Sequence, residues 1–383
     1  MKKQTVILLI GGIAALMAAM GIGRFAFTPI LPLMLEHHLL SPAGAGYLAS
    51  SNYLGYLIGA LVLSFIQVRS RTVFLLGGLA ASLLTTWGMG ELIDFDGWLL
   101  LRFLSGIASA VVFVIASSIV MDRLSGFQAG LFYGGVGAGI LLTGLAVPIL
   151  ADGGDWAMAW KGLGAISLIL GAAAWLMMKE RSDSPASISV SSREQTASVR
   201  HILVWLMIAY GLEGLGYIVT GTYLVAYAKT ISGISNIGAI SWTLVGVAGV
   251  ISCLVWSVLA SRWGKKWTLA ISMALQAAGI ALPVLFPSSV SLIVSALLFG
   301  GTFMGITMLF VAYAKDIYPQ NNRQIIGLLT TFFGTGQIIG PLVAGSLISA
   351  YGSYSSALIG AAAVVLLGAI GLPIGISCIR MPE

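Results

Sequence analysis

The chain has 383 residues, of which 58% are hydrophobic and 8% are charged, with 19 Lys and Arg against 13 Asp and Glu. Soluble domains carry about 25% charged residues, so this composition excludes a soluble globular protein and indicates a polytopic membrane protein. The positive charges are spread over separate short segments, which excludes a basic nucleic-acid-binding surface and leaves nucleic acid out of the expected partners.

Twelve apolar runs are long enough to span a membrane as helices, because a span needs about 20 residues and lipid satisfies no free backbone group. In chain order these runs are 5–35, 43–66, 73–93, 98–121, 128–151, 157–178, 201–228, 239–259, 267–285, 290–313, 325–350 and 357–377. The first run follows Met-Lys-Lys, as in a signal peptide, but it continues past Ile30. We therefore expect an uncleaved first helix and an all-α membrane fold.

The first run contains an arginine in the segment GIGRFAFTPILPLM, residues 21–34. A charge in hydrocarbon costs at least ~2.5 kcal/mol, so Arg24 is expected to face protein, water or an anionic ligand. Pro29 follows about one turn later and is expected to disturb the helix. This arginine is the first pointer to a functional site.

The loops that join the runs differ in charge. With twelve spans both termini share one side, and nearly all Lys and Arg outside the runs fall in the loops of that side, whereas Lys229 alone falls in the other set. The positive-inside rule then predicts cytoplasmic termini and a multi-pass protein of a bacterial-type plasma (inner) membrane. Cys253 lies in a span and Cys378 in the tail, so no disulfide is expected.

The longest polar segment, residues 179–200, divides the runs into six and six. We interpret it as a cytoplasmic linker between an N-terminal half, 1–178, and a C-terminal half, 201–383. At an offset of 193 residues Gly21 matches Gly214, and Arg69 matches Arg262. Two six-helix halves related by an axis along the membrane normal are an organisation found among secondary transporters.

Four motifs occur in the expected helices and loops: LASRWGKKW (259–267), LRFLSGIASA (101–110), GTGQIIGPLVAG (334–345), and Trp156 and Trp160 before Lys161. Together they resemble the loop, helix-4, glycine-proline and Trp-Arg signatures of the major facilitator superfamily. GIGRFAFTPILPLM and GLFYGGVGAGILLTGL (130–145) are similar to its YbfB/YjiJ branch. The resemblance implies a transporter whose substrate site lies between two six-helix halves.

The loop signature in this family includes an acidic residue, and here Ser261 and Val68 stand in its place. The latch that this residue forms in the family is therefore not expected. The gating-loop positions that remain are Arg69, Arg71, Arg262, Gly264, Lys265 and Lys266. The alternative is that the arginines only anchor the loops on the cytoplasmic side.

The resemblance further implies that helices 1, 4, 7 and 10 line a central cavity. Polar side chains in spans are unusual, and those near this cavity are the candidate substrate contacts: Arg24, Asn52, Tyr53, Arg102, Tyr217, Thr220, Trp242, Tyr313 and Gln337. Glu213 is the only carboxylate near the middle of a span. A carboxyl group away from bulk water takes up a proton more readily, so Glu213 is the candidate proton-coupling residue.

Structural roles are the alternatives for these residues. Arg24 and Glu213 could pair across the halves as a strut without a ligand. Arg102 lies only about one turn past Trp98, where a long side chain can extend to the interface. Asn52, Tyr53 and Gln337 could simply join helices by hydrogen bonds. His37 and His38 stand near Glu36 alone, so no metal site is expected.

Enzymatic motifs are missing from the sequence, since neither a protease arrangement within the spans nor a nucleotide-binding loop occurs. We expect a non-enzymatic secondary transporter without a cofactor, working by alternating access as a monomer in the lipid bilayer, with a proton and a small-molecule substrate as partners. Two arginines against one acid in the cavity helices favour a small organic anion. The alternatives are efflux of hydrophobic or cationic compounds, with Glu213 as anchor and aromatic walls from Trp242, Tyr217 and Tyr313, or a membrane sensor or scaffold that transports nothing.

Overall fold

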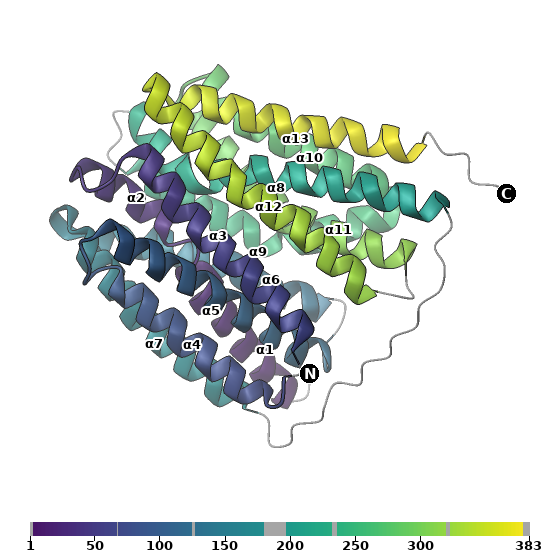
Figure 1. Cartoon of the computed structure of the whole chain (residues 1–383), viewed down its shortest axis with the longest axis horizontal. Coiled ribbons are helices and arrows are strands. Elements are labelled where there is room, and N and C mark those ends of the chain that lie inside the picture. Colours follow the sequence, from purple (N-terminus) through teal and green to yellow (C-terminus); the bar gives the residue numbers. More distant parts are fainter. Residues whose placement is uncertain are drawn as a thin grey trace.

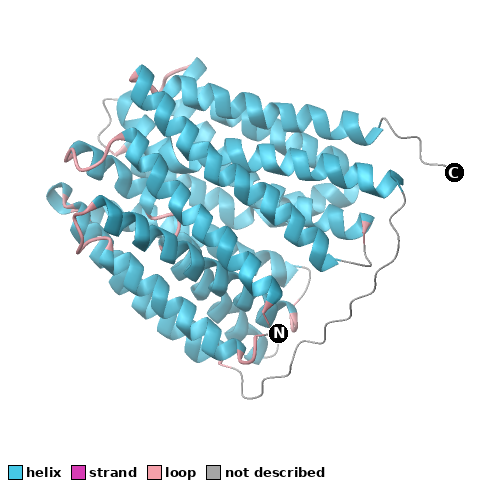
Figure 2. Cartoon of the chain, viewed as in Figure 1, coloured by secondary structure: helices cyan, strands magenta, loops and turns pink. Residues whose placement is uncertain are grey.

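The structure is a computed structural model that describes residues 3–66, 68–124, 127–179, 197–231, 236–318 and 322–377. A helix occupies each of the twelve predicted runs (Figures 1 and 2). The first run holds α1 Lys3–Leu16, the π-helix η1 Met17–Ile22 and α2 Phe27–Glu36. The others are α3 Pro42–Phe65, α4 Arg71–Gly88, α5 Phe95–Met121, α6 Phe127–Leu150, α7 Trp156–Met178, α8 Ala197–Ile231, α9 Ile237–Trp263, α10 Lys265–Leu285, α11 Ser289–Ile317, α12 Asn322–Tyr351 and α13 Tyr354–Ser377. The short 3-10 helix η2 Asp152–Gly154 precedes α7.

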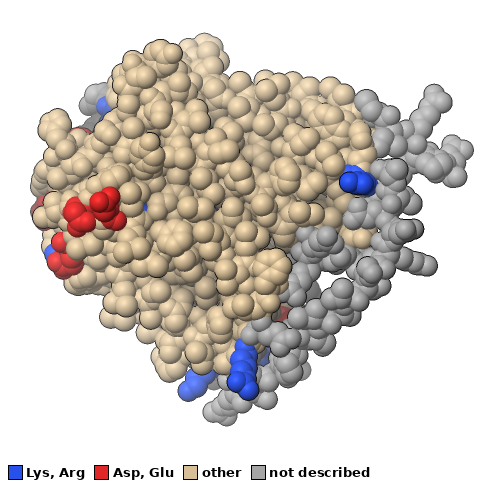
Figure 3. All heavy atoms as spheres, viewed as in Figure 1, with Lys and Arg blue, Asp and Glu red and all other residues tan. Residues whose placement is uncertain are grey.

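Within the described residues, eleven helices are long and apolar enough to cross a membrane. The predicted run without such a helix is 73–93, where α4 is 18 residues long and begins at the charged Arg71. The predicted all-α membrane fold is confirmed. On the face in Figure 3, a broad uncharged belt lies between one end, where Asp and Glu side chains gather beside some Lys or Arg atoms, and the opposite end, where Lys and Arg side chains stand out.

Short polar caps explain where many helices begin. The side chains of Ser41, Ser70, Asp94, Asp155 and Ser288 each accept a hydrogen bond from the backbone N–H three residues further on. Such caps satisfy N–H groups that the first helical turn leaves free. The long apolar runs thus have sharply defined starts, close to those predicted from hydropathy.

Within residues 3–178, α3 packs on α5, α4 on α7 and α1 on α6. Within the later helices, α9 packs on α11, and α13 packs on both α8 and α10. Figure 1 shows α4 and α7 on one side of the bundle and α10 and α13 on the opposite side. The two groups meet where α3 packs on α12, α6 on α9 and α2 on α8. This packing fits the predicted halves 1–178 and 201–383, which stay a prediction.

The predicted linker 179–200 falls largely outside the described residues, since 180–196 are not among them. Its last part is helical, because α8 already begins at Ala197. The tail residue Cys378 also lies outside the described residues.

Candidate functional site

The helix of the first membrane run winds more loosely at its centre, where bonds to the residue five positions earlier mix with the usual ones to the fourth. After the π-helix η1, residues 23–26 form a turn before α2, and the backbone N–H of Phe25 donates to the Met20 carbonyl at 3.1 Å. Two features accompany this local change in winding. Pro29 lies in the first turn of α2, where its missing N–H costs least, and a Cβ on Gly139 would lie 2.6 Å from the Cα of Gly21, so α6 presses closely on η1.

Arg102 and Ser105 of α5 hold this turn in place. The Arg102 guanidinium donates from Nη1 to the Gly23 carbonyl at 3.1 Å and from Nη2 to the Arg24 carbonyl at 3.2 Å, and Ser105 Oγ donates to Gly23 O at 2.8 Å. The guanidinium also lies 5.1 Å from the Phe27 ring centroid. Arg102 is 1% exposed. Its contacts favour a structural role over substrate contact, because backbone carbonyls occupy its terminal nitrogens, but the side chain is buried in the bundle and does not extend to the membrane interface.

Arg24 projects from the turn into a cage of aromatic rings. Its Cζ lies 4.8 Å from the Tyr53 centroid, 4.4 Å from the Tyr56 centroid and 5.5 Å from the Phe25 centroid. The side chain is 3% exposed, and Nε and Nη2 donate to no group of the described residues. Cation–π contacts stabilise the charge, but two buried N–H donors without acceptors cost free energy. The arginine is therefore placed and oriented while part of its hydrogen-bonding capacity stays unused.

Tyr217 of α8 approaches Arg24 from the other helix group. Phe303 of α11 contacts both the Phe25 ring and the Tyr217 ring at 6.3 Å between centroids, and Gln337 Nε2 of α12 donates a hydrogen bond to the Tyr217 hydroxyl. The Tyr217 ring stacks at 5.4–6.3 Å on the rings of Phe299, Phe303 and Phe333. Four of the predicted substrate contacts, Arg24, Tyr53, Tyr217 and Gln337, thus come together where the two helix groups meet.

Glu213 lies one helical turn before Tyr217 and is 1% exposed. Its Oε1 accepts a hydrogen bond from Gln276 Nε2 of α10 at 2.8 Å, while Glu213 Oε2 and Gln276 Oε1 have no partner in the described part of the chain. No ion pair joins Glu213 to Arg24. The strut considered from the sequence is therefore not formed, and the two charged residues occupy adjoining sites linked by Tyr217.

The remaining candidates lie around this cluster or away from it. Asn52 Nδ2 donates to the Arg102 carbonyl at 2.9 Å, and Trp242 Nε1 of α9 donates to Thr143 Oγ1 of α6 at 3.1 Å. Thr220 Oγ1 is buried without a partner among the described residues. Tyr313 lies near the end of α11, one turn before Asp316, and the structure does not bring it to Arg24.

Sequence reasoning missed two residues of the site, Tyr56 and Gln276. Tyr56 follows Tyr53 by three residues, a spacing that puts both rings on one face of α3. Gln276 is a polar side chain inside the apolar run 267–285. Both residues could therefore have been singled out from the sequence, although the sequence does not predict which residues they contact.

The predicted gating loops contain ion pairs of their own. Arg71 at the start of α4 pairs with Asp122 after α5 at 2.5 Å, and Lys265 at the start of α10 pairs with Asp316 of α11. Gly264 joins α9 to α10 at φ 78°, which favours glycine. Arg69 and Arg262 are exposed. Ser261 stands where the family has an acidic residue, and its hydroxyl donates to the Val258 carbonyl of its own helix.

A family model described as "Uncharacterised MFS-type transporter YbfB" matches residues 16–372, nearly the whole chain. The chain belongs to this family. It is a major facilitator transporter, a membrane protein without enzymatic activity, as the sequence motifs indicated.

Relatives of this transporter share its length. The "Uncharacterized MFS-type transporter YcaD" of Escherichia fergusonii is 23% identical over 367 residues, covering 91% of this chain and 90% of the relative. YcaD of Escherichia coli K12 is 23% identical over 357 residues, covering 88% and 87%. Among solved structures, nucleoside transporter NupG is 16% identical with a TM-score of 0.73 over 97% of this chain and 99% of NupG. The POT family transporter PepTSo is 13% identical with a TM-score of 0.75 over 99% and 98%. These likenesses show the fold.

Proposed function

We propose that this transporter moves a small organic anion, such as a carboxylate, by proton-coupled alternating access. The observation that carries the proposal is the Arg24 guanidinium, which is 3% exposed and whose Nε and Nη2 have no partner among the residues that the structure describes. A carboxylate can accept from two guanidinium nitrogens at once and would satisfy both donors. Tyr53 and Tyr56 hold the guanidinium from its sides, which reduces the conformational entropy lost on binding.

Glu213 is the proposed proton site. A protonated Glu213 offers a donor at Oε2, and the neighbouring Gln276 has an unused acceptor at Oε1. With Gln276 Nε2 already donating to Glu213 Oε1, the protonated acid and the amide complement each other, whereas an ionised carboxylate supplies no donor. Protonation therefore satisfies more polar atoms of this buried pair.

Tyr217 is the proposed link between anion and proton. It lies one helical turn beyond Glu213, its ring and the ring of Phe25, the neighbour of Arg24, both contact Phe303, and its hydroxyl accepts a hydrogen bond from Gln337. An anion at Arg24 adds negative charge near this hydroxyl and disfavours ionised Glu213, so anion binding and proton uptake favour each other. Such linkage is reciprocal for the two binding free energies.

Alternating access is supported by contacts at one end of the bundle. There Glu36 of α2 pairs with Lys229 of α8 at 2.6 Å, Thr28 donates to the Gly221 carbonyl, and Tyr223 donates to the Pro42 carbonyl at 3.0 Å. Thr28 with Gly221 and Glu36 with Lys229 are each 193 residues apart, which is the repeat offset. Contacts between equivalent positions are expected at an axis relating two halves, so these residues form a proposed outer gate.

Cross-linking the outer gate should stop transport. We expect Glu36→Cys with Lys229→Cys, in a Cys253→Ser and Cys378→Ser background, to react with a short cleavable bifunctional thiol reagent. Uptake or efflux in proteoliposomes should fall to background, because the gate can no longer open, and return when a reductant cleaves the reagent.

Each single-cysteine variant provides the control, since modification at one position cannot join α2 to α8. Full transport by the doubly reacted, cross-linked protein would contradict alternating access through this gate.

Organic acids should stabilise the purified protein against heat. A ligand at 100 times its Kd stabilises by about 2.7 kcal/mol, so a thermal-shift screen of organic acids, sugars, amino acids and lipophilic cations should give the largest shift for an acid. Proteoliposome flux of that acid then shows whether the acid is transported.

The Arg24→Ala variant is the control in this screen and should not respond to the acid. Stabilisation by lipophilic cations with no response to acids would contradict the anion proposal and favour cation efflux.

A further inference from the structure

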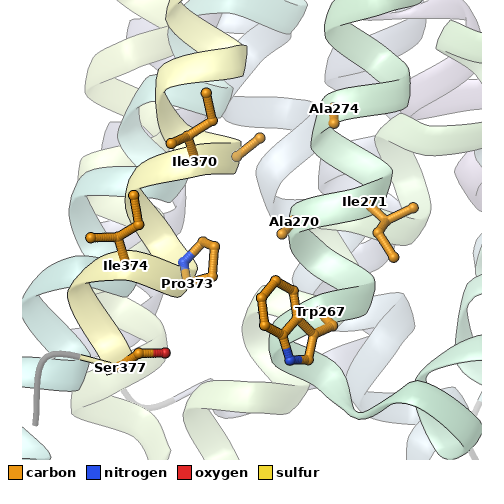
Figure 4. Close-up of a pocket in the computed structure, with 9 residues that line it drawn as sticks. Trp267, Ala270, Ile271, Ala274, Ile370, Pro373, Ile374 and Ser377 are labelled. Carbon is orange, nitrogen blue, oxygen red and sulfur yellow. The ribbon is translucent and has the colours of Figure 1, made fainter.

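A groove of about 490 Å³ lies between α10 and α13, apart from the site around Arg24 (Figure 4). Its floor contains small residues such as Ala270 and Ala274 together with the Pro373 ring. The rim residues Ile370 and Ile374 are 50% and 57% exposed. The groove is therefore open on the apolar outer surface of the bundle, which the hydrocarbon of a bilayer contacts.

The length of the groove suits part of one lipid chain. Its α10 wall runs from Trp267 to Ala274, about 10 Å at a rise of 1.5 Å per residue. That is about a third of the ~30 Å hydrocarbon core. Apart from the Trp267 ring nitrogen and the Ser377 hydroxyl, which lie at the same end, the lining side chains are apolar.

At the polar end of the groove Lys266 carries a positive charge that no carboxylate of the described residues neutralises. Lys266 Nζ donates to Ser377 Oγ at 3.0 Å and lies 5.1 Å from the Trp267 ring centroid. Among the described residues no carboxylate lies within ion-pair distance of Lys266, whereas the adjacent Lys265 is paired with Asp316. The two neighbouring lysines are thus electrostatically different.

A second groove is apolar as well, but it does not end at a basic side chain without a carboxylate partner. It has a volume of about 620 Å³, lies between α4 and α5, and is lined by residues such as Val73 and Leu104. The basic residue at the start of α4, Arg71, is neutralised by Asp122 at 2.5 Å. Of these two grooves, the one at α10 and α13 joins an apolar lining to an ammonium group that has no carboxylate partner in the described part of the chain.

We propose that the groove between α10 and α13 binds an anionic phospholipid. One acyl chain lies along Ala270, Ala274 and Pro373, and the phosphate contacts the Lys266 ammonium and the Ser377 hydroxyl. Trp267 stands at the boundary between chain and headgroup, where tryptophan is favoured. Basic pockets between helices at the membrane surface recognise anionic headgroups. This lipid site is independent of the proposed substrate and proton sites.

Native mass spectrometry of the delipidated full chain tests the proposal, with phosphatidylglycerol and phosphatidylcholine of equal chain length as probes. We expect tighter binding of phosphatidylglycerol by the wild type. Lys266→Gln should weaken phosphatidylglycerol roughly fivefold, the effect of one basic residue at an anionic surface, and leave phosphatidylcholine unchanged. Ala274→Phe, which fills the groove, should weaken both lipids.

The matched control is the double variant Lys265→Gln with Asp316→Asn, which removes the adjacent ion pair without changing net charge and should keep the preference for phosphatidylglycerol. Undiminished phosphatidylglycerol binding by Lys266→Gln would overturn the proposal. The proposal would also be overturned if Ala274→Phe bound both lipids as the wild type does, or if the double variant lost as much phosphatidylglycerol binding as Lys266→Gln. A dimer of the chain in place of a lipid-bound monomer would overturn it as well.

Discussion

Arg24→Ala should lower the affinity for the transported anion about 100-fold or more, because two hydrogen bonds from a charged donor contribute about 1.5–3 kcal/mol each. Transport in proteoliposomes should fall nearly to background. Arg24→Lys keeps the charge but loses the planar pair of donors, so its affinity should lie between those of wild type and Arg24→Ala. Titration of the acid by thermal shift and flux measures both effects.

Lys161→Gln is the matched control for Arg24→Ala, since it removes one positive charge from a partly exposed side chain that pairs with Glu91 at 3.2 Å. An exposed pair of this kind is worth about 0–1 kcal/mol, so little change is expected. Normal transport by Arg24→Ala at wild-type expression would refute the proposed anion contact.

The helices of this fold are largely predictable from sequence, including a disturbance near Pro29, but the π-helix at Met17–Ile22 is not. Apolar runs bounded by Ser or Asp caps define where spans begin. The run 5–35 is apolar through residues 17–26, so hydropathy predicts a continuous helix there. The turn at residues 23–26 depends on tertiary contacts, namely Gly21 against Gly139 and the Arg102 guanidinium on the Gly23 and Arg24 carbonyls.

For the candidate site, the sequence predicts which residues are unusual but not which residues they contact. A charge in hydrocarbon was enough to single out Arg24 and Glu213. Their partners were not predictable, because helices that are apolar all round carry little information about which face meets which neighbour. At the repeat offset of 193 residues Arg24 matches Tyr217, one helical turn beyond Glu213, which predicts that the two charged residues adjoin. The offset does not predict the contacts of Arg24 with the Tyr53 and Tyr56 rings or of Glu213 with Gln276.

Glu213→Gln should abolish accumulation driven by a pH gradient while substrate exchange across a gradient-free membrane continues. A glutamine cannot titrate, but its amide can still donate to Gln276 Oε1, as the protonated acid would, so the helix contact and the fold should survive. The measurement is flux of the stabilising acid in proteoliposomes, once with an imposed pH gradient and once as exchange with the acid on both sides.

Glu91→Gln is the control for this substitution, because Glu91 is a half-exposed carboxylate paired with Lys161, and both fluxes should persist in it. Retained accumulation in Glu213→Gln would exclude the proton role. Loss of exchange as well would show that Glu213 acts in binding or folding, since a residue that only carries the coupling proton is not needed when no gradient is used. The anion proposal would survive either result, because it depends on the unpaired Nε and Nη2 donors of Arg24, which Glu213 does not contact.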